Sequence, residues 1–296
     1  MHWSKMRDSN AKKSTKPMDY ASITVTPLTP AIGVEISGVN LATELPDTTI
    51  AEIRHAWLEH LVVFFRDQTL TPQTLVNFSR RFGEIGYYPF VKGMEKHPEV
   101  VEVAKKPDEK INFGGLWHTD TSYLELPPLG SLLYAVEVPT VGGDTLFANM
   151  YRAYEALSDG MKQLLDGLRA VNSAEKPDAA ITRVHRIADR PNDASDIVTT
   201  VSHPIVRTHP ETQRKALYCS DAHTMNIEGM TAAESRPLLQ YLYSVQQREE
   251  WQCRFHWHPG SVAIWDNRCA QHNALNDYHG HRRTMYRVTL KGDTPS

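Results

Sequence analysis

The residues best suited to chemistry in this sequence are a histidine and an aspartate two positions apart, His118 and Asp120. Side chains two apart on a β-strand point to the same face, so a strand here would project both into one cavity. His272, which follows a predicted strand much further along the chain, is the candidate for a third ligand. Two histidines and a carboxylate form the facial triad of non-haem Fe(II) oxygenases, which leaves coordination positions open for co-substrate and oxygen.

This pattern is short, and other interpretations of it stay open at this point. The chain has 14 histidines, so a histidine two positions from an aspartate can occur by chance. The same ligand types can also hold zinc. The remaining candidate residues must therefore decide between these interpretations.

Two arginines in the segment 282–290 form a second group of candidates. On a strand, Arg283 and Arg287 share one face and lie about 13 Å apart, at about 3.3 Å per residue. A buried guanidinium needs an anion, because an unpaired buried charge is very costly, and arginine grips a carboxylate with two parallel hydrogen bonds. The alternatives are surface arginines on an edge strand and, for Arg287, an ion pair with an internal Asp or Glu.

Short strands predominate among the elements that must position these residues. Segments typical of strands are 62–65, 100–103, 131–136, 145–148, 216–219, 261–265 and 284–290. Helices are predicted after Asp47, from Thr71, over 151–168 with a break near 158–159, and from Thr231, which forms a capping-box pattern with Glu234. Many short strands with a few covering helices predict a mainly β fold, a double-sheet jelly roll. Residues 172–200 lack clear periodicity and predict an extended loop that could act as a lid.

Composition and charge exclude several classes of function. The chain has 296 residues, 41% of them hydrophobic and 23% charged, with a net charge of −3 and no basic stripe, so we expect no nucleic-acid partner. No apolar run suggests a membrane span. The three cysteines are too few and too scattered for a disulfide framework, which predicts a cytoplasmic protein. We expect a disordered tail over residues 1–20 and one domain over 21–296.

Several motifs in one order give the chain a strong resemblance to a known family. The chain resembles the taurine dioxygenase and 2,4-dichlorophenoxyacetate dioxygenase (TauD/TfdA) family from about Ile23 to Asp293. The segments that carry the resemblance are Trp117–Asp120, Gly142–Thr145, His209–Thr212, Lys215–Tyr218, Trp265–Arg268, His272 and Arg282–Arg283.

The resemblance implies a distorted double-stranded β-helix (jelly roll) and a 2-oxoglutarate-dependent dioxygenase that uses Fe(II) and O2. By motif, it assigns the iron ligands to His118, Asp120 and His272. It assigns the distal carboxylate of 2-oxoglutarate, the co-substrate, to Thr145 and Arg283. Arg287 corresponds to the residue that meets the substrate sulfonate in taurine dioxygenases.

The segments expected around the substrate depart from the taurine dioxygenases. Gly86–Val91 stands where those enzymes place a His and a Tyr, Asn112–Gly115 replaces a more polar approach, and His223 replaces an aromatic residue. We expect Tyr88 and His223 to shape the substrate pocket beside Arg287. The expected reaction is hydroxylation of a small anionic sulfonate, alkyl sulfate or aryloxyalkanoate, with succinate and CO2 as co-products.

Two other functions could use the same ligands. One is a zinc- or manganese-dependent, cupin-like hydrolase, and the other is a binding protein that has kept the fold without the chemistry. The pair of Thr145 and Arg283 favours the oxygenase, because a hydrolase has no need of a second carboxylate anchor. The expected partners are a small anionic substrate and further copies of the chain in a homo-oligomer.

Overall fold

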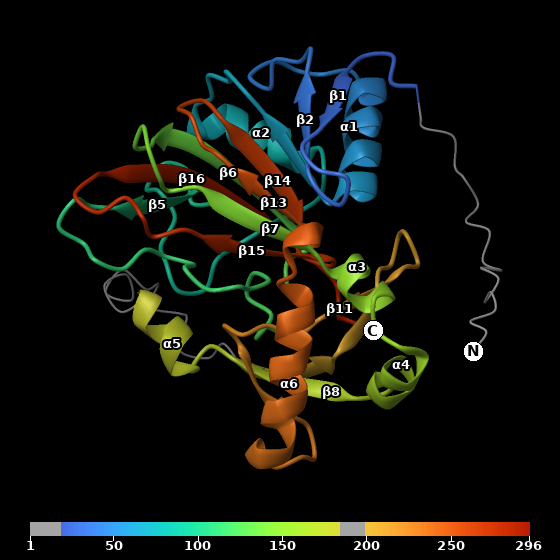
Figure 1. Cartoon of the computed structure of the whole chain (residues 1–296). Coiled ribbons are helices and arrows are strands. Elements are labelled where there is room, and N and C mark those ends of the chain that lie inside the picture. Colours follow the sequence, from blue (N-terminus) through green and yellow to red (C-terminus); the bar gives the residue numbers. More distant parts are fainter. Residues whose placement is uncertain (1–18, 184–198) are drawn as a thin grey trace, which may run out of the picture.

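The computed structural model describes residues 19–183 and 199–296, and its strands form two main sheets that enclose a buried interior (Figure 1). The tail expected over residues 1–20 lies outside the described residues, except for Asp19 and Tyr20. Residues 184–198 of the expected lid loop also lie outside them. Within the described part of the chain, no helix is long and apolar enough to cross a membrane.

The larger sheet has eight strands, in the order β1-β2-β3-β14-β6-β16-β4, and β5 also pairs with β16. The strands are β1 (Thr24–Pro27), β2 (Val34–Ser37), β3 (Val62–Phe65), β4 (Ile85–Gly86), β5 (Val101–Lys105), β6 (Gly130–Glu137), β14 (Val262–Asp266) and β16 (Arg283–Leu290). The predicted strands at 62–65, 100–103, 131–136, 261–265 and 284–290 are thus confirmed, with small shifts at their ends.

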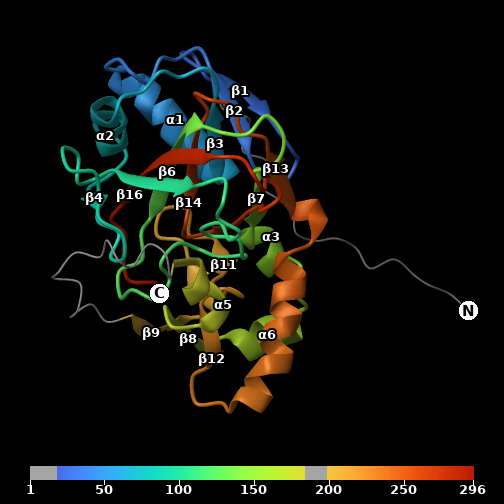
Figure 2. The same cartoon turned by 90° about the vertical axis from the view of Figure 1, so that its left-hand side faces the viewer.

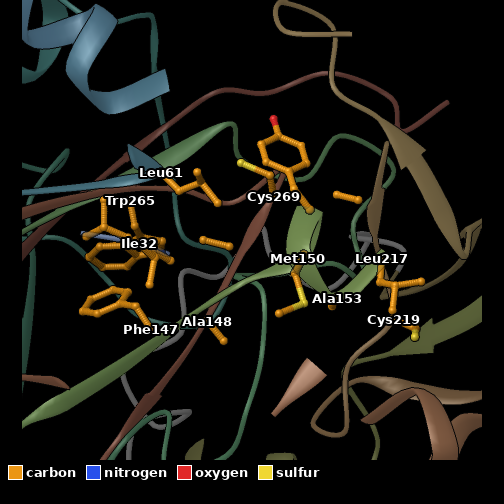
Figure 3. Packing of buried hydrophobic residues seen from close by; sticks show 14 of the residues in the cluster. Ile32, Leu61, Phe147, Ala148, Met150, Ala153, Leu217, Cys219, Trp265 and Cys269 are labelled. Atoms are coloured by element: carbon orange, nitrogen blue, oxygen red, sulfur yellow. The ribbon is translucent and has the colours of Figure 1, made fainter. Parts of the chain in front are cut away.

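The smaller sheet consists of β13 (Gln252–Phe255), β7 (Thr145–Asn149) and β15 (Ala270–Ala274), paired in that order. Its inward side chains pack against those of the larger sheet, and Figure 3 shows Phe147 of β7 close to Trp265 of β14. The two rings have their centroids 5.9 Å apart. These facing sheets confirm the mainly β, jelly-roll architecture expected from the sequence.

The alternation of side chains along β16 is what directs the two arginines inward. Met285 belongs to the core between the two sheets, whereas Val288 belongs to the core on the opposite face of the larger sheet. Because side chains alternate along a strand, Arg283 and Arg287 point to the same side as Met285. The predicted sidedness of this strand is confirmed.

Two helices cover the outer face of the larger sheet, on the upper side of the molecule in Figures 1 and 2. Helix α1 (Asp47–His60) buries Ile53 and Trp57, and α2 (Pro72–Arg80) begins at a capping box formed by Thr71 and Thr74. Asp47 lies in the first turn of α1 and does not cap it, because Pro46 occupies the N-cap position.

The remaining elements lie on the lower side of the molecule (Figure 2). They are α3 (Met150–Glu155), α4 (Asp159–Leu165), α5 (Pro177–Ala180), α6 (Ala232–Gln246), the sheet β12 (Thr224–Ile227), β8 (Arg169–Ser173) and β9 (Thr200–Pro204), and the hairpin β10 (Val206–Thr208) and β11 (Lys215–Leu217). The helix break near 158–159 and the Thr231–Glu234 capping box are both confirmed.

The expectation of one extended loop over residues 172–200 is wrong for its described parts. Strand β8 reaches Ser173, α5 and a 3-10 turn (Ile181–Arg183) follow, and β9 begins at Thr200. Strand β8 pairs with both β9 and β12. Short strands held by such distant partners leave little periodicity in their own sequence, which is why the pattern was missed.

Candidate functional site

Three buried side chains meet between the two sheets and present ligand atoms to one point. The ligand atoms of His118, Asp120 and His272 all lie within 4.8 Å of one another. The Nε2 atoms of His118 and His272 are 3.6 and 3.7 Å from Oδ1 of Asp120. Two imidazole nitrogens and one carboxylate oxygen suit a divalent iron ion and leave room for further ligands. The structure therefore brings together the three residues predicted to hold the metal.

The segment that carries His118 and Asp120 is not a strand, contrary to the expectation from the sequence. His118 forms only an isolated bridge with His272, in which each backbone N–H donates to the other carbonyl, at 3.1 and 2.9 Å. Asp120 follows in a turn, and Thr121 has a left-handed φ of 43°. The two side chains converge because the bridge anchors the loop to β15, and not because of strand alternation.

The ring of His118 is oriented by its own loop. Its Nδ1 donates to the carbonyl of Leu116 at 2.6 Å, which leaves the lone pair of Nε2 for a metal. Gly114, at φ +77°, lies against the ring, and a Cβ there would come within 3.1 Å of Cε1. The glycine in the segment Asn112–Gly115 thus allows the close approach of loop and ligand.

The two oxygens of the Asp120 carboxylate have different neighbours. Oδ2 accepts from the Ser131 hydroxyl at 2.8 Å and from the Trp265 indole at 3.2 Å, and it pairs with Nη2 of Arg287 at 2.9 Å. Oδ1 faces the two histidines. Three donors therefore fix the plane of the carboxylate and leave Oδ1 as the atom available to a metal.

The charges around the site favour the metal-binding forms of two ligands. Although burial opposes ionisation, Arg287 and the two histidines hold the pKa of Asp120 well below its usual range. Burial, together with the neighbouring His118, lowers the pKa of His272 well below its usual range. A charged carboxylate and a neutral imidazole are the forms that bind a divalent metal.

The structure places Arg287 against Asp120, which is the alternative left open for this residue by the sequence. Its Nη2 bonds Asp120 and also lies 3.3 Å from Oγ of Ser131, while its Nε is buried without a hydrogen-bond partner. Tyr88 lies under the guanidinium, with 5.5 Å from Cζ to the ring centroid. One donor of Arg287 thus remains available for a second acceptor.

Arg283 and Thr145 line one cavity with His118 and His272, two of the three predicted metal ligands. This cavity is lined by residues of both sheets, among them Val103, Leu133, Thr145, Phe147, Trp265, His272 and Arg283. Arg283 is 6% exposed, its Nε and Nη2 have no hydrogen-bond partner, and burial lowers its pKa. A buried guanidinium in that state lacks an anion, and a carboxylate between Arg283 and Thr145 would supply one. These residues fit a 2-oxoglutarate carboxylate.

The glycines of the Gly142–Thr145 motif let the chain pass close to this arginine. Gly143, at φ +71°, lies against the side chain of Arg283, where a Cβ would come within 3.4 Å of Cδ. Its N–H donates to Asp277 at 2.7 Å. The turn thereby holds the start of β7, and hence Thr145, beside the guanidinium.

A second cavity shares Phe113, His118 and Arg287 with the first. Its lining includes the predicted pocket residues Tyr88, His223 and Arg287, together with Phe113, Leu116, Tyr123, Ala179, Thr182 and Ala222. His223 Nδ1 is 3.2 Å from the hydroxyl of Ser122. The predicted substrate residues therefore lie beside the predicted metal ligands, in a largely apolar and aromatic cavity.

Sequence reasoning missed three residues that hold the site in place. Ser131 and Asn267 bond each other at 3.2 Å, and Asn267 also accepts from the Trp265 indole at 3.0 Å. Trp257 donates to Thr145 at 3.0 Å. The Trp265–Arg268 motif was a signal for Asn267, but nothing local marks Ser131 or Trp257.

The other two residues of that motif, Asp266 and Arg268, form a buried ion pair. Arg268 donates to both oxygens of Asp266, at 2.8 and 2.7 Å, and Nε2 of His209 lies 3.0 Å from Oδ2. Nδ1 of His209 accepts the N–H groups of Glu211 and Thr212. Because every one of these atoms already has a partner, the cluster has a structural role and lacks free ligands for a metal.

Comparison with known proteins agrees with this geometry. Residues 24–289 match the family described as taurine catabolism dioxygenase TauD, TfdA family. An alpha-ketoglutarate-dependent sulfate ester dioxygenase of Pseudomonas putida is 35% identical, over 97% of this chain and 95% of its own length. A taurine dioxygenase structure from Burkholderia xenovorans superposes with a TM-score of 0.77 at 37% identity, covering 93% of this chain and 91% of that one. The structure of AAD-2 with Mn(II) and N-oxalylglycine gives a TM-score of 0.78 at 27% identity, covering 93% and 99%.

Proposed function

We propose, since the chain belongs to the taurine catabolism dioxygenase TauD, TfdA family, that it oxidises a small organic anion with an apolar body. The chain is a 2-oxoglutarate-dependent dioxygenase, an oxidoreductase, and the family uses Fe(II), 2-oxoglutarate and O2. The substrate classes we propose are alkyl sulfates, sulfonates and aryloxyalkanoates.

The first part of the proposal concerns the metal. We assign the iron to Nε2 of His118, Nε2 of His272 and Oδ1 of Asp120, the three atoms that converge in the cavity. With Fe(II), 2-oxoglutarate and O2 the site would convert a substrate C–H to C–OH, with one oxygen atom of O2 going to the alcohol and the other to succinate as 2-oxoglutarate loses CO2. The protein holds the ligands at fixed orientations and surrounds them with apolar side chains that exclude water.

The second part concerns the co-substrate. Arg283 and Thr145 would hold the distal carboxylate of 2-oxoglutarate, since the guanidinium is buried without an anion of its own. That contact would fix one end of the keto acid, and His118 and His272 line the same cavity, where its other end could meet the metal. A hydrolase would not require this anchor.

The lining of the substrate cavity supports the proposed substrate class. Among the described residues that line it, Asp120 is the only carboxylate, and its oxygens are already used by Arg287 and the histidines. An ammonium group on the substrate would therefore find no counter-charge, whereas Arg287 lines the cavity and has one N–H without an acceptor. Tyr88, Phe113 and Leu116 suit an alkyl or aryl body. This distribution of charge favours a sulfate ester or a simple sulfonate over taurine.

A sulfate ester would fragment after hydroxylation. A hydroxyl group on the carbon that bears the ester oxygen collapses to a carbonyl, and sulfate leaves with the electron pair of the C–O bond. The biological result would be release of sulfate from the ester and formation of an aldehyde.

Succinate formation from a panel of alkyl sulfates, alkyl sulfonates, aryloxyalkanoates and taurine tests this function. We expect turnover with at least one apolar anion and weak turnover with taurine. A second comparison uses two substrates of one shape, an acid and its amide: the acid should be preferred in the wild type, and Arg287→Met should remove the preference. Preference for the neutral analogue or for taurine in the wild type would overturn the proposed substrate class.

A further inference from the structure

Trp257 contacts both groups that we assign to the distal carboxylate, although it does not line the cavity itself. It follows β13 and is 2% exposed. Its indole N–H donates to the hydroxyl of Thr145 at 3.0 Å, and the Cζ atom of Arg283 lies 5.7 Å from its ring centroid.

The hydrogen bond from Trp257 decides what the Thr145 hydroxyl can do. An indole nitrogen can only donate, so the threonine oxygen must accept, and its own proton must point elsewhere. No hydrogen bond from this hydroxyl to another described residue is present, and Thr145 lines the cavity beside Arg283. The remaining direction for the proton is toward the cavity, where a carboxylate oxygen is the natural acceptor.

Trp257 contacts Arg283 through its ring face and not through a hydrogen bond. A ring face attracts a guanidinium but accepts none of its N–H groups in the manner of a carboxylate. The ring of Trp257 can therefore hold the plane of Arg283 without neutralising its charge. Nε and Nη2 of Arg283 accordingly stay without a hydrogen-bond partner.

We infer that Trp257 is a positioning residue for 2-oxoglutarate, which sets the Thr145 hydroxyl as a donor and orients Arg283 toward the distal carboxylate. The inference rests on the proposed anchoring by Thr145 and Arg283. It adds a residue outside the cavity that acts through both anchors.

A double-mutant cycle on the full chain tests this role, with binding of N-oxalylglycine in the presence of Mn(II) measured by calorimetry. The variants are Trp257→Phe, Thr145→Val and the double variant, and Trp251→Phe serves as a control indole remote from the cavity. We expect Trp257→Phe to weaken binding about fivefold, the equivalent of one neutral hydrogen bond. Phenylalanine keeps a ring face for Arg283 and removes only the indole N–H, so in the Thr145→Val background the same change should have no further effect. N-methyloxamate, which lacks the distal carboxylate, should bind all variants equally.

The possible outcomes distinguish the role of Trp257 from the anchoring of 2-oxoglutarate by Thr145 and Arg283. Unchanged binding in Trp257→Phe, with weakened binding in Thr145→Val, would overturn the role of Trp257 and leave the anchoring intact. Unchanged binding in Thr145→Val and in Arg283→Gln would overturn the anchoring itself. Equal weakening by Trp257→Phe in both backgrounds, or of N-methyloxamate as well, would show a general packing effect and also overturn the inference.

A second measurement covers the case in which Trp257→Phe does not fold. With ¹⁵N-labelled tryptophan and Zn(II) in the site, the indole N–H signal of Trp257 should move when N-oxalylglycine binds to the wild type. In Thr145→Val, which removes its acceptor, this response should be lost. An indole signal that responds equally in the two proteins contradicts a role through Thr145.

Discussion

At the scale of single residues, the site depends on how one carboxylate is shared. Oδ2 of Asp120 is held by Ser131, Trp265 and Arg287, so Oδ1 is left for the metal. The negative charge of Asp120 also neutralises the buried guanidinium of Arg287. Asp120 thus has an electrostatic role in addition to its proposed role as a ligand.

Asp120→Asn should abolish Fe(II)-dependent turnover, because an amide is a weak ligand and cannot neutralise Arg287. Metal binding by calorimetry and succinate formation measure the two effects. Ser131→Ala is the matched control, since it removes neutral and charge-assisted hydrogen bonds of the hydroxyl, worth about 1 kcal/mol or more each, and keeps the charge of Asp120. Full iron-dependent activity in Asp120→Asn would show that this carboxylate is not a ligand.

Arg283→Ala should raise the KM for 2-oxoglutarate at least about tenfold, because a charge-assisted contact is worth about 1.5–3 kcal/mol. Arg282→Ala is the control: the neighbouring side chain is half exposed and pairs with Glu137. Initial rates at varied 2-oxoglutarate give the constant. A change confined to the constant of the other substrate would contradict the assignment.

At the scale of elements, the turn between β14 and β15 positions two parts of the site. It begins where Trp265 and Asn267 support Asp120, and it leads directly into the strand that carries His272. The buried ion pair of Asp266 and Arg268 holds this turn, with His209 on one carboxylate oxygen. Breaking that pair should therefore disturb both the fold and the positions of the metal ligands Asp120 and His272 that we propose.

Arg268→Leu should lower the free energy of unfolding by about 3–5 kcal/mol, because it leaves the carboxylate of Asp266 buried without its partner. Urea unfolding followed by circular dichroism measures this loss. The control is Arg254→Leu, which breaks an ion pair with Asp144 whose arginine is 57% exposed and should cost at most about 1 kcal/mol. Equal losses in the two variants would contradict the structural role of the Asp266–Arg268 pair.

At the scale of the whole molecule, two cores lie on opposite faces of the larger sheet, and all three cysteines are buried free thiols. Burial raises the pKa of Cys219 and of Cys253 to about 12. A raised folded-state pKa means that the folded protein holds the proton more tightly than the unfolded chain. The resulting stability is complete below the usual thiol pKa and is lost as the pH rises toward 12.

The free energy of unfolding should therefore fall between about pH 9 and pH 12, by about 1.4 kcal/mol per pH unit for each such thiol. Urea midpoints measured across this range under reducing conditions give the slope. Cys253→Ala removes one titrating group and should make the slope shallower by that amount. An unchanged slope in this variant would show that Cys253 ionises equally in both states.

The sequence predicted candidate residues for the chemistry and most of the elements. The motifs pointed to His118, Asp120 and His272 as metal ligands, and the family resemblance assigned the distal carboxylate to Thr145 and Arg283. Alternation along 283–290 correctly placed both arginines on the inner face, since strand periodicity is a local property. Many short strands with few helices suggested the jelly roll, and the family resemblance implied it.

How these residues are held depends on contacts that only the folded chain makes. His118 and Asp120 converge through a bridge to His272 and not through a strand, and Arg287 takes Asp120 as its partner. The short elements within 169–204 exist because β8 pairs with distant strands. Trp257 reaches Thr145 from the segment that follows β13, the strand paired with β7. Each of these facts depends on contacts between residues far apart in the chain, which leave no periodic or local signal in the sequence.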